Sequence, residues 1–128
     1  MSLFKNIFGS SDEQPSPSKV NWIPLTSLAD LDAMSTASNE KPVLIFKHST
    51  RCSISRMVLK QFEKDFSLED SITPYFLDLL NHRDVSNEIA DRFNVYHQSP
   101  QLLVIKEGKS IFDASHESID ASDLKQYV

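Results

Sequence analysis

The sequence predicts an α/β domain in which helices cover both faces of a mixed sheet of about five strands. Apolar residues at helical spacing alternate along the chain with short apolar runs, which is typical of strands joined by helical crossovers. The runs at residues 43–46 and 102–105 are continuously apolar, as in central strands that are covered on both faces. Gly108 follows the second run and predicts a tight hairpin turn into a further strand.

The chain is expected to begin its fold with a strand and a helix. Residues 20–25 form the strand, in which Pro24 is tolerated best at a sheet edge. Ser27 predicts the cap of the helix, because Asp30 stands three residues later. The apolar residues of this helix are Leu28, Leu31 and Met34. The helix should end before Pro42, since the residue that precedes a proline disfavours the helical conformation.

Two further helices are expected, each with an apolar residue at every fourth position. In the helix that follows Cys52, these residues are Ile54, Val58 with its neighbour Met57, Phe62 and Phe66. In the helix that Asp84 caps, they are Val85, Ile89 and Phe93. A strand over residues 72–80 separates these helices, and a strand over residues 110–112 precedes a last helix capped by Asp120. The apolar residues of the last helix are Leu124 and Val128.

Composition narrows the class of protein. The chain has 128 residues, of which 40% are apolar and 24% charged, as in one ordinary globular domain. Its formal net charge of −5 argues against a protein that neutralises nucleic-acid phosphates. We therefore expect no nucleic-acid partner. No apolar run approaches the roughly 20 residues of a membrane span, so we expect no membrane partner either. The acidic pI and the unpaired cysteine fit a reducing cytoplasm, which is the location we expect. Polar residues and two prolines predict a flexible tail over residues 1–19, before a domain over residues 20–128.

The single cysteine is the most informative residue. Cys52 follows a buried strand and opens a helix, where free backbone amides and the helix dipole favour the thiolate. Arg51 and Arg56 add positive charge, and the hydroxyl or N–H group of Ser55 could reach the sulfur. We therefore expect a partly exposed, nucleophilic Cys52; the alternative is a buried, inert cysteine that packs as a small hydrophobe. Because there is one cysteine, any redox role must be intermolecular.

A proline stands directly before the second apolar run. Ser99 and Pro100 precede residues 102–105, and a proline that enters a central strand is tolerated best where a cis bond makes a tight turn. An ordinary trans proline in a loop is the alternative.

On this order of elements, the cysteine and the proline together resemble the thioredoxin fold, in which a Cys-x-x-Cys/Ser motif opens a helix and faces a cis-proline loop. More narrowly, residues 46–55, Phe-Lys-His-Ser-Thr-Arg-Cys-Ser-Ile-Ser, are similar to the monothiol bacilliredoxins of bacillithiol-using bacteria. That group carries a Thr-Cys-Pro-Ile-Ser centre after a Phe-Lys-His-Ser strand end. Arg51 replaces its usual threonine and Ser53 its proline. The second change should relax the turn and alter the redox potential.

The resemblance implies a role for each residue around the thiol. Cys52 would be the attacking thiol, Ser55 would occupy the place of the absent resolving cysteine, and Pro100 would be the cis-proline. The backbone of Ser99 would pair with the client chain as an added strand, with Thr50 beside it. The supporting residues would be Lys47, His48, Arg51, Ser53, Ile54 and Arg56.

The same resemblance implies the reaction. Cys52 would take bacillithiol from an S-bacillithiolated client protein as a transient mixed disulfide, with no bound cofactor. Since Ser55 cannot resolve this adduct, a second low-molecular-weight thiol or a reductase would have to release it. We expect a monomer. The alternatives are a thioredoxin-fold module that binds partners or senses redox state without turnover, and a monothiol exchanger that uses another small thiol.

Three side chains near the motif have open roles. Lys47 could make Cys52 more reactive or extend along the sheet with its ammonium in water. Asp78 could be a buried proton shuttle or could face solvent at a strand edge. His48 lacks partners at metal-ligand spacing, so we expect no metal.

Overall fold

The structure, a computed structural model, describes residues 19–128, so nearly all of the tail expected at residues 1–19 lies outside the described residues. The elements in chain order are β1 (Ile23–Pro24), α1 (Leu28–Ala37), β2 (Val43–His48), α2 (Ser53–Asp65), β3 (Thr73–Asp78), α3 (Arg83–Phe93), β4 (Gln101–Lys106), β5 (Lys109–Ser115) and the 3₁₀ helices η1 (His116–Ser118) and η2 (Ala121–Tyr127). No helix within this part of the chain is long and apolar enough to cross a membrane.

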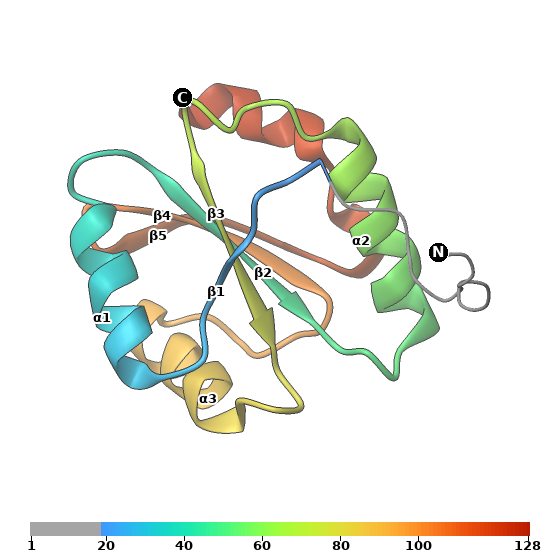
Figure 1. Cartoon of the computed structure of the whole chain (residues 1–128), viewed down its shortest axis with the longest axis horizontal. Coiled ribbons are helices and arrows are strands. Elements are labelled where there is room, and N and C mark those ends of the chain that lie inside the picture. The colour runs from blue at the N-terminus through green and yellow to red at the C-terminus, as the bar shows by residue number, and fades with distance from the viewer. Residues whose placement is uncertain (1–18) are drawn as a thin grey trace, which may run out of the picture.

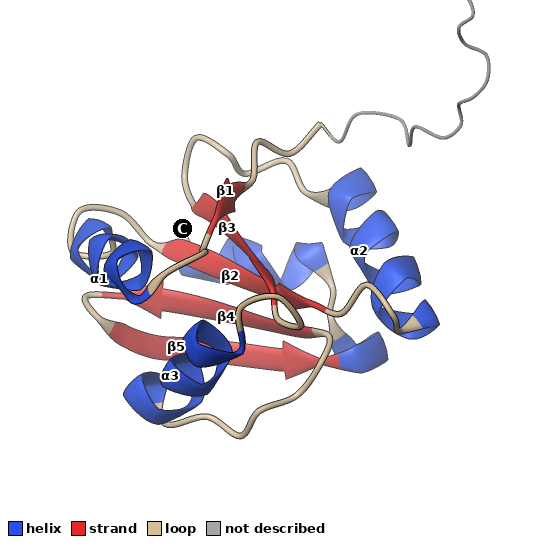
Figure 2. Cartoon of the chain, turned by 60° about the horizontal axis from the view of Figure 1, so that its bottom comes forward, coloured by secondary structure: helices blue, strands red, loops and turns tan. Residues whose placement is uncertain are grey.

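The strands form one mixed sheet in the order β1-β3-β2-β4-β5. The pairs β1–β3 and β2–β3 are parallel, whereas β2–β4 and β4–β5 are antiparallel. Helices α1 and α3 cover one face, and α2 and η2 cover the other (Figures 1 and 2). The predicted α/β fold with helices on both faces of a five-stranded mixed sheet is thus confirmed.

The central strand β2 divides the core into two clusters. Successive side chains of a strand point to opposite faces, and all six residues of β2 are buried. Val43 and Ile45 pack in the cluster beneath α1 and α3. Leu44 and Phe46 pack in the cluster beneath α2 and η2. This alternation also assigns the last two residues of β2: Lys47 lies on the face of α1 and α3, and His48 on the face of α2.

The register brings the two predicted functional segments to one end of the sheet. β4 runs antiparallel to β2, and Lys47 near the end of β2 pairs with Gln101 at the start of β4. The turn that follows β2 carries Cys52, and the loop that precedes β4 carries Ser99 and Pro100. Both therefore lie where β2 ends and β4 begins.

The predicted cap of α1 is confirmed. The Ser27 hydroxyl accepts a hydrogen bond from the Asp30 amide at 3.1 Å. The Asp30 carboxylate in turn accepts from the amide and the hydroxyl of Thr26, and these bonds lower its pKa. At the other end of the chain, the Asp120 carboxylate caps η2 by accepting from the Ser122 amide at 2.9 Å.

Other boundary predictions are wrong. The N-cap of α3 is His82, and Asp84 lies inside the first turn, where a carboxylate still interacts favourably with the helix dipole. The strand expected over residues 20–25 spans only Ile23–Pro24. Pro24 has no N–H group to donate to a neighbouring strand. The strand expected over residues 72–80 spans Thr73–Asp78, and the last strand is longer than expected.

Four predicted core residues are also wrong, since Leu28, Ile54, Met57 and Val128 are exposed. In the first turn of α2, Ser55 takes the buried position that was expected for Ile54. Leu28 and Val128 are terminal residues, the first at the start of α1 and the second at the end of the chain.

Candidate active site at the start of helix α2

The thiol lies at the N-terminus of α2. Cys52 is the N-cap residue and is half-buried, as expected for a partly exposed thiol. Its amide donates to the Ser49 carbonyl at 3.2 Å, and its carbonyl accepts from the Arg56 amide at 3.1 Å. Its side chain makes no capping hydrogen bond to the helix. The backbone around Cys52 is therefore held in place while the sulfur remains free for an incoming group.

The Ser55 hydroxyl does not bond to the sulfur, which was one of the two contacts the sequence suggested for this residue. It is fully buried, and its hydroxyl hydrogen-bonds to His48 Nδ1 at 2.8 Å and accepts from the Ser49 amide at 3.1 Å. No hydrogen bond joins the Ser55 hydroxyl to Cys52 within residues 19–128. The hydroxyl instead fastens the first turn of α2 to the end of β2.

His48 is the second member of this buried contact. It is 6% exposed, its ring lies 5.5 Å from the Phe76 ring, and burial lowers its pKa, an effect that the Asp78 carboxylate partly offsets. Asp78 pairs with His48 in the register of β2 and β3. One Asp78 carboxylate oxygen accepts from Asn81 at 2.8 Å, whereas the other is buried without a hydrogen-bond partner among the described residues. The Asp78 carboxylate is thus half-buried, between the buried position and the solvent-exposed position that the sequence left open.

The expectation that the Lys47 ammonium reaches water is wrong. Its side chain is fully buried, so the ammonium does not reach water, and it lies on the sheet face opposite α2. The Nζ atom lies 2.8 Å from His97 Nδ1 and 2.9 Å from Gln101 Oε1. Burial lowers the Lys47 pKa to about 8.

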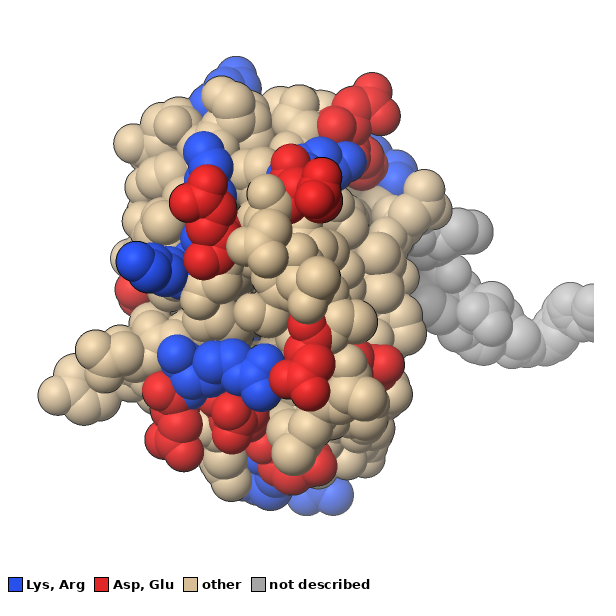
Figure 3. All heavy atoms as spheres, turned by 90° about the vertical axis from the view of Figure 1, so that its left-hand side faces the viewer, with Lys and Arg blue, Asp and Glu red and all other residues tan. Residues whose placement is uncertain are grey.

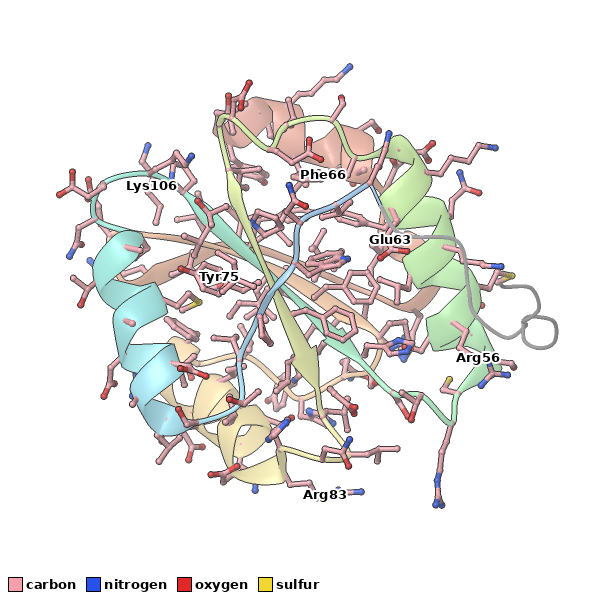
Figure 4. All side chains as sticks on the ribbon, in the orientation of Figure 1. Arg56, Glu63, Phe66, Tyr75, Arg83 and Lys106 are labelled. Carbon is pink, nitrogen blue, oxygen red and sulfur yellow. The ribbon has the colours of Figure 1, made fainter. Side chains whose placement is uncertain are left out.

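The remaining predicted residues surround Cys52 at the surface. Arg56 lies at the start of α2 (Figure 4), and its guanidinium donates to the Thr50 carbonyl at 2.9 Å, which braces the turn between β2 and α2. The exposed residues of this region are Thr50, Arg51, Ser53, Ile54 and Arg56. Between residues 19 and 128, no group of three His, Cys, Asp or Glu side chains is arranged to hold a metal ion.

The loop before β4 has the backbone form implied by the resemblance. The peptide bond between Ser99 and Pro100 is cis. Pro100 is buried, and its carbonyl accepts from the His116 amide at 2.9 Å. No described residue hydrogen-bonds to the main-chain N–H or C=O of Ser99, and the Ser99 hydroxyl is buried without a partner among those residues. The Ser99 backbone therefore keeps hydrogen-bonding capacity that an added strand could use.

Sequence reasoning missed two residues at this site, both of which contact Lys47. His97 and Gln101 were missed because their contacts with Lys47 depend on the register of β2 and β4, which no local pattern reveals.

Comparison with known proteins places this geometry in context. The family model described as monothiol bacilliredoxin BrxC matches residues 23–124. A solved structure of a thioredoxin-fold protein, proposed to be an oxidoreductase, is 35% identical, with a TM-score of 0.68 over 81% of this chain and 90% of that one. Malassezia sympodialis thioredoxin is 19% identical, with a TM-score of 0.67 over 89% and 93% of the two chains. Fasciola hepatica thioredoxin is 16% identical, with a TM-score of 0.63 over 81% and 93%. The fold is the thioredoxin fold.

Proposed function

Because this chain belongs to the monothiol bacilliredoxin family, a group of thioredoxin-fold proteins with thiol redox function, we propose that it removes bacillithiol from S-bacillithiolated proteins by exchange at Cys52. One observation carries the proposal: the chain's single cysteine is half-buried at a helix start, at the same end of the sheet as the Ser99 backbone, to which no residue between 19 and 128 hydrogen-bonds. A helix N-terminus favours the thiolate, which is the attacking form in disulfide exchange.

The first step transfers bacillithiol to the protein. The Cys52 thiolate attacks the bacillithiol sulfur of the client's mixed disulfide, and a new disulfide forms between Cys52 and bacillithiol. The bond between the client and bacillithiol breaks, and the client sulfur leaves as a thiolate that takes up a proton. One disulfide replaces another, so this step needs no external oxidant or reductant.

The second step needs a partner thiol. Ser55 stands three residues after Cys52 but has no sulfur, and its hydroxyl is engaged with His48 and Ser49. A second free thiol, from bacillithiol or from a reductase, must therefore attack the adduct and regenerate the Cys52 thiol. The adduct should accumulate when no such thiol is supplied.

The surroundings of Cys52 suit a client chain. The backbone of Ser99 offers one N–H and one C=O group to an extended client segment, the mode in which a peptide adds a strand. The exposed Ile54 side chain, two residues after Cys52, supplies apolar contact near the thiol. Arg51, also exposed, supplies positive charge that favours the carboxylates of an anionic small thiol.

The test is the mass of the intact protein after it is mixed with a bacillithiolated peptide, beside a glutathionylated control peptide. We expect one bacillithiol to appear on the wild type and none on Cys52→Ala, with slower transfer from the glutathione control. Equal transfer of both would retain the exchange chemistry and reject bacillithiol as the preferred thiol. No transfer of either would reject the enzyme and favour a binding or redox-sensing module.

A further inference from the structure

Lys47 carries a charge in an unusual place, the buried core of the described domain. The side chain is fully buried, and its two hydrogen-bond partners, His97 and Gln101, carry no negative charge. No carboxylate among residues 19–128 lies within ion-pair distance of it. A buried cation without an acidic partner destabilises a fold, so its presence calls for a role beyond packing.

The contacts of Lys47 join two segments that are distant in sequence. Lys47 belongs to β2, which leads into the turn that carries Cys52. His97 lies in the loop that carries Ser99 and Pro100, and Gln101 is the first residue after that loop. The Gln101 amide group also donates to the Tyr96 carbonyl at 3.0 Å. A single ammonium therefore holds residues 97 and 101 directly, and Gln101 in turn holds residue 96.

We propose that Lys47 is a positioning residue whose ammonium fixes the loop over residues 96–100, and with it the Ser99 backbone on which a client chain pairs. The assignment of the client rests on the proposed function, whereas the fixing of the loop does not. Hydrogen bonds from a charged donor are about twice as strong as neutral ones, so the ammonium holds the loop better than an amide or a hydroxyl could.

The geometry also sets the protonation state of His97. An ammonium only donates, so His97 Nδ1 must accept, and the ring proton lies on Nε2. A proton on Nδ1 would point at the ammonium and break the contact. Burial and the charges of Lys47 and Arg83 lower the pKa of His97, in keeping with this arrangement.

The groups that face Lys47 confine the contact to a window of pH. The loop provides His97, and β4 provides the neutral Gln101. Helix α3 provides Arg83 and the neutral Ser86, whose hydroxyl lies 3.4 Å from His97 Nδ1. β3 provides the apolar Leu77 as the register partner. The contact weakens at acid pH, when His97 takes up a proton, and again above about 8, when Lys47 loses one.

The first test measures the loop itself by hydrogen–deuterium exchange of the full chain at pH 7. The variants are Lys47→Met, which keeps an apolar side chain of similar length, and His97→Ala, which removes the other end of the contact at an exposed residue. The control is Lys106→Met, an exposed lysine at the end of β4 remote from Arg56 (Figure 4). We expect amides of residues 96–99 and 101 to exchange about tenfold faster in both variants and to be unchanged in the control.

The second test separates positioning of the client from reactivity of the thiol. Alkylation of Cys52 by iodoacetamide needs the thiolate but not the loop, so its rate should stay within about twofold in Lys47→Met. The KM for a bacillithiolated peptide should rise about tenfold, with little change in kcat. In the wild type this KM should also rise between pH 7 and pH 9, whereas the KM of Lys47→Met should not respond.

The outcomes distinguish this inference from the proposed function. Unchanged loop exchange in both variants would overturn the positioning role, and His97→Ala decides the matter if Lys47→Met does not fold. Faster loop exchange with an unchanged KM would reject the link to the client. Faster loop exchange in a protein whose wild type transfers no bacillithiol would retain the fixing of the loop and reject the proposed function.

Discussion

Ser55 illustrates how one side chain takes a structural role at a position where related redox motifs can carry chemistry. A cysteine there could resolve a mixed disulfide, whereas the Ser55 hydroxyl is fully buried against His48 and the Ser49 amide. Both partners would be left without a hydrogen bond if the hydroxyl were removed. A buried polar group that loses its partner costs more than the hydrogen bond itself contributed.

We therefore predict that Ser55→Ala lowers the free energy of unfolding by about 1–3 kcal/mol. Urea unfolding at pH 7 measures this loss. Ser53→Ala is the matched control, because Ser53 lies in the same turn of α2 and is exposed. An equal loss in both variants, or none in Ser55→Ala, would contradict the structural role.

At the scale of elements, a single serine fastens helix α1 to the turn between β4 and β5. Ser38 is 1% exposed at the end of α1. Its hydroxyl donates to the Ser35 carbonyl at 2.6 Å and accepts from the Gly108 amide at 2.8 Å. Its carbonyl accepts from the Glu107 amide at 2.9 Å. The hairpin turn is thus tied to a helix about 70 residues earlier in the sequence.

Loss of this hydroxyl should be costly. Ser38→Ala leaves the half-buried Gly108 amide without this hydrogen bond, and we expect the free energy of unfolding to fall by about 1–3 kcal/mol in urea titrations. Ser35→Ala serves as the comparison, because the Ser35 hydroxyl bonds to no described residue while its carbonyl remains. A smaller effect in Ser38→Ala than in Ser35→Ala would argue against the tie.

Gly108 makes the turn possible by its conformation. Its φ angle is +75°, and a β-carbon added at this position would meet only the Ser35 hydroxyl at 3.7 Å, which is ordinary contact. The cost of Gly108→Ala is therefore conformational rather than steric. We predict a loss of about 1–2 kcal/mol, measured as a lower urea midpoint with an unchanged m-value. An unaffected midpoint would mean that the turn relaxes to another conformation.

Sequence reasoning correctly predicted the features that depend on residues close together in the chain. The Ser27 cap, the continuous apolar run of β2 and the placement of Cys52 at a helix start each depend on neighbours in the chain. The ends of short elements were predicted less well. β1 spans only Ile23–Pro24, and its length depends on which hydrogen bonds it makes to the neighbouring strand, which the local sequence does not reveal. The burial of Lys47 was missed because a lysine inside an apolar run is normally expected to be exposed.

At the scale of the whole molecule, charged side chains have oppositely charged neighbours at the surface, whereas the buried Lys47 has neutral ones. On the face seen in Figure 3, acidic and basic side chains intermingle without a patch of one sign. Arg92 on α3 forms ion pairs with Asp32 of α1 at 2.9 Å and with Glu88 at 3.1 Å. Such exposed pairs contribute little to stability. The interior, in contrast, holds the ammonium of Lys47 with two neutral partners.

This interior charge makes stability depend on pH in a predictable direction. The folded protein lowers the Lys47 pKa from 10.5 to about 8, so between these values the unfolded chain binds more protons than the folded one. The contribution of Lys47 to the free energy of unfolding therefore rises with pH. The penalty of burying the cation is at most about 3 kcal/mol; it is present in full below pH 8 and disappears above the pKa of the unfolded chain, 10.5.

Comparison with Lys47→Met isolates that contribution, since every other titrating group is shared. We predict that wild type gains stability relative to Lys47→Met between pH 7 and pH 10, as measured by urea unfolding at both values, while Lys106→Met keeps a constant difference from wild type. A constant difference for Lys47→Met would mean that the ammonium is stabilised fully by its hydrogen bonds to His97 and Gln101. A gain would instead mean that the protein tolerates a destabilising charge in order to hold the loop before β4 in place near neutral pH.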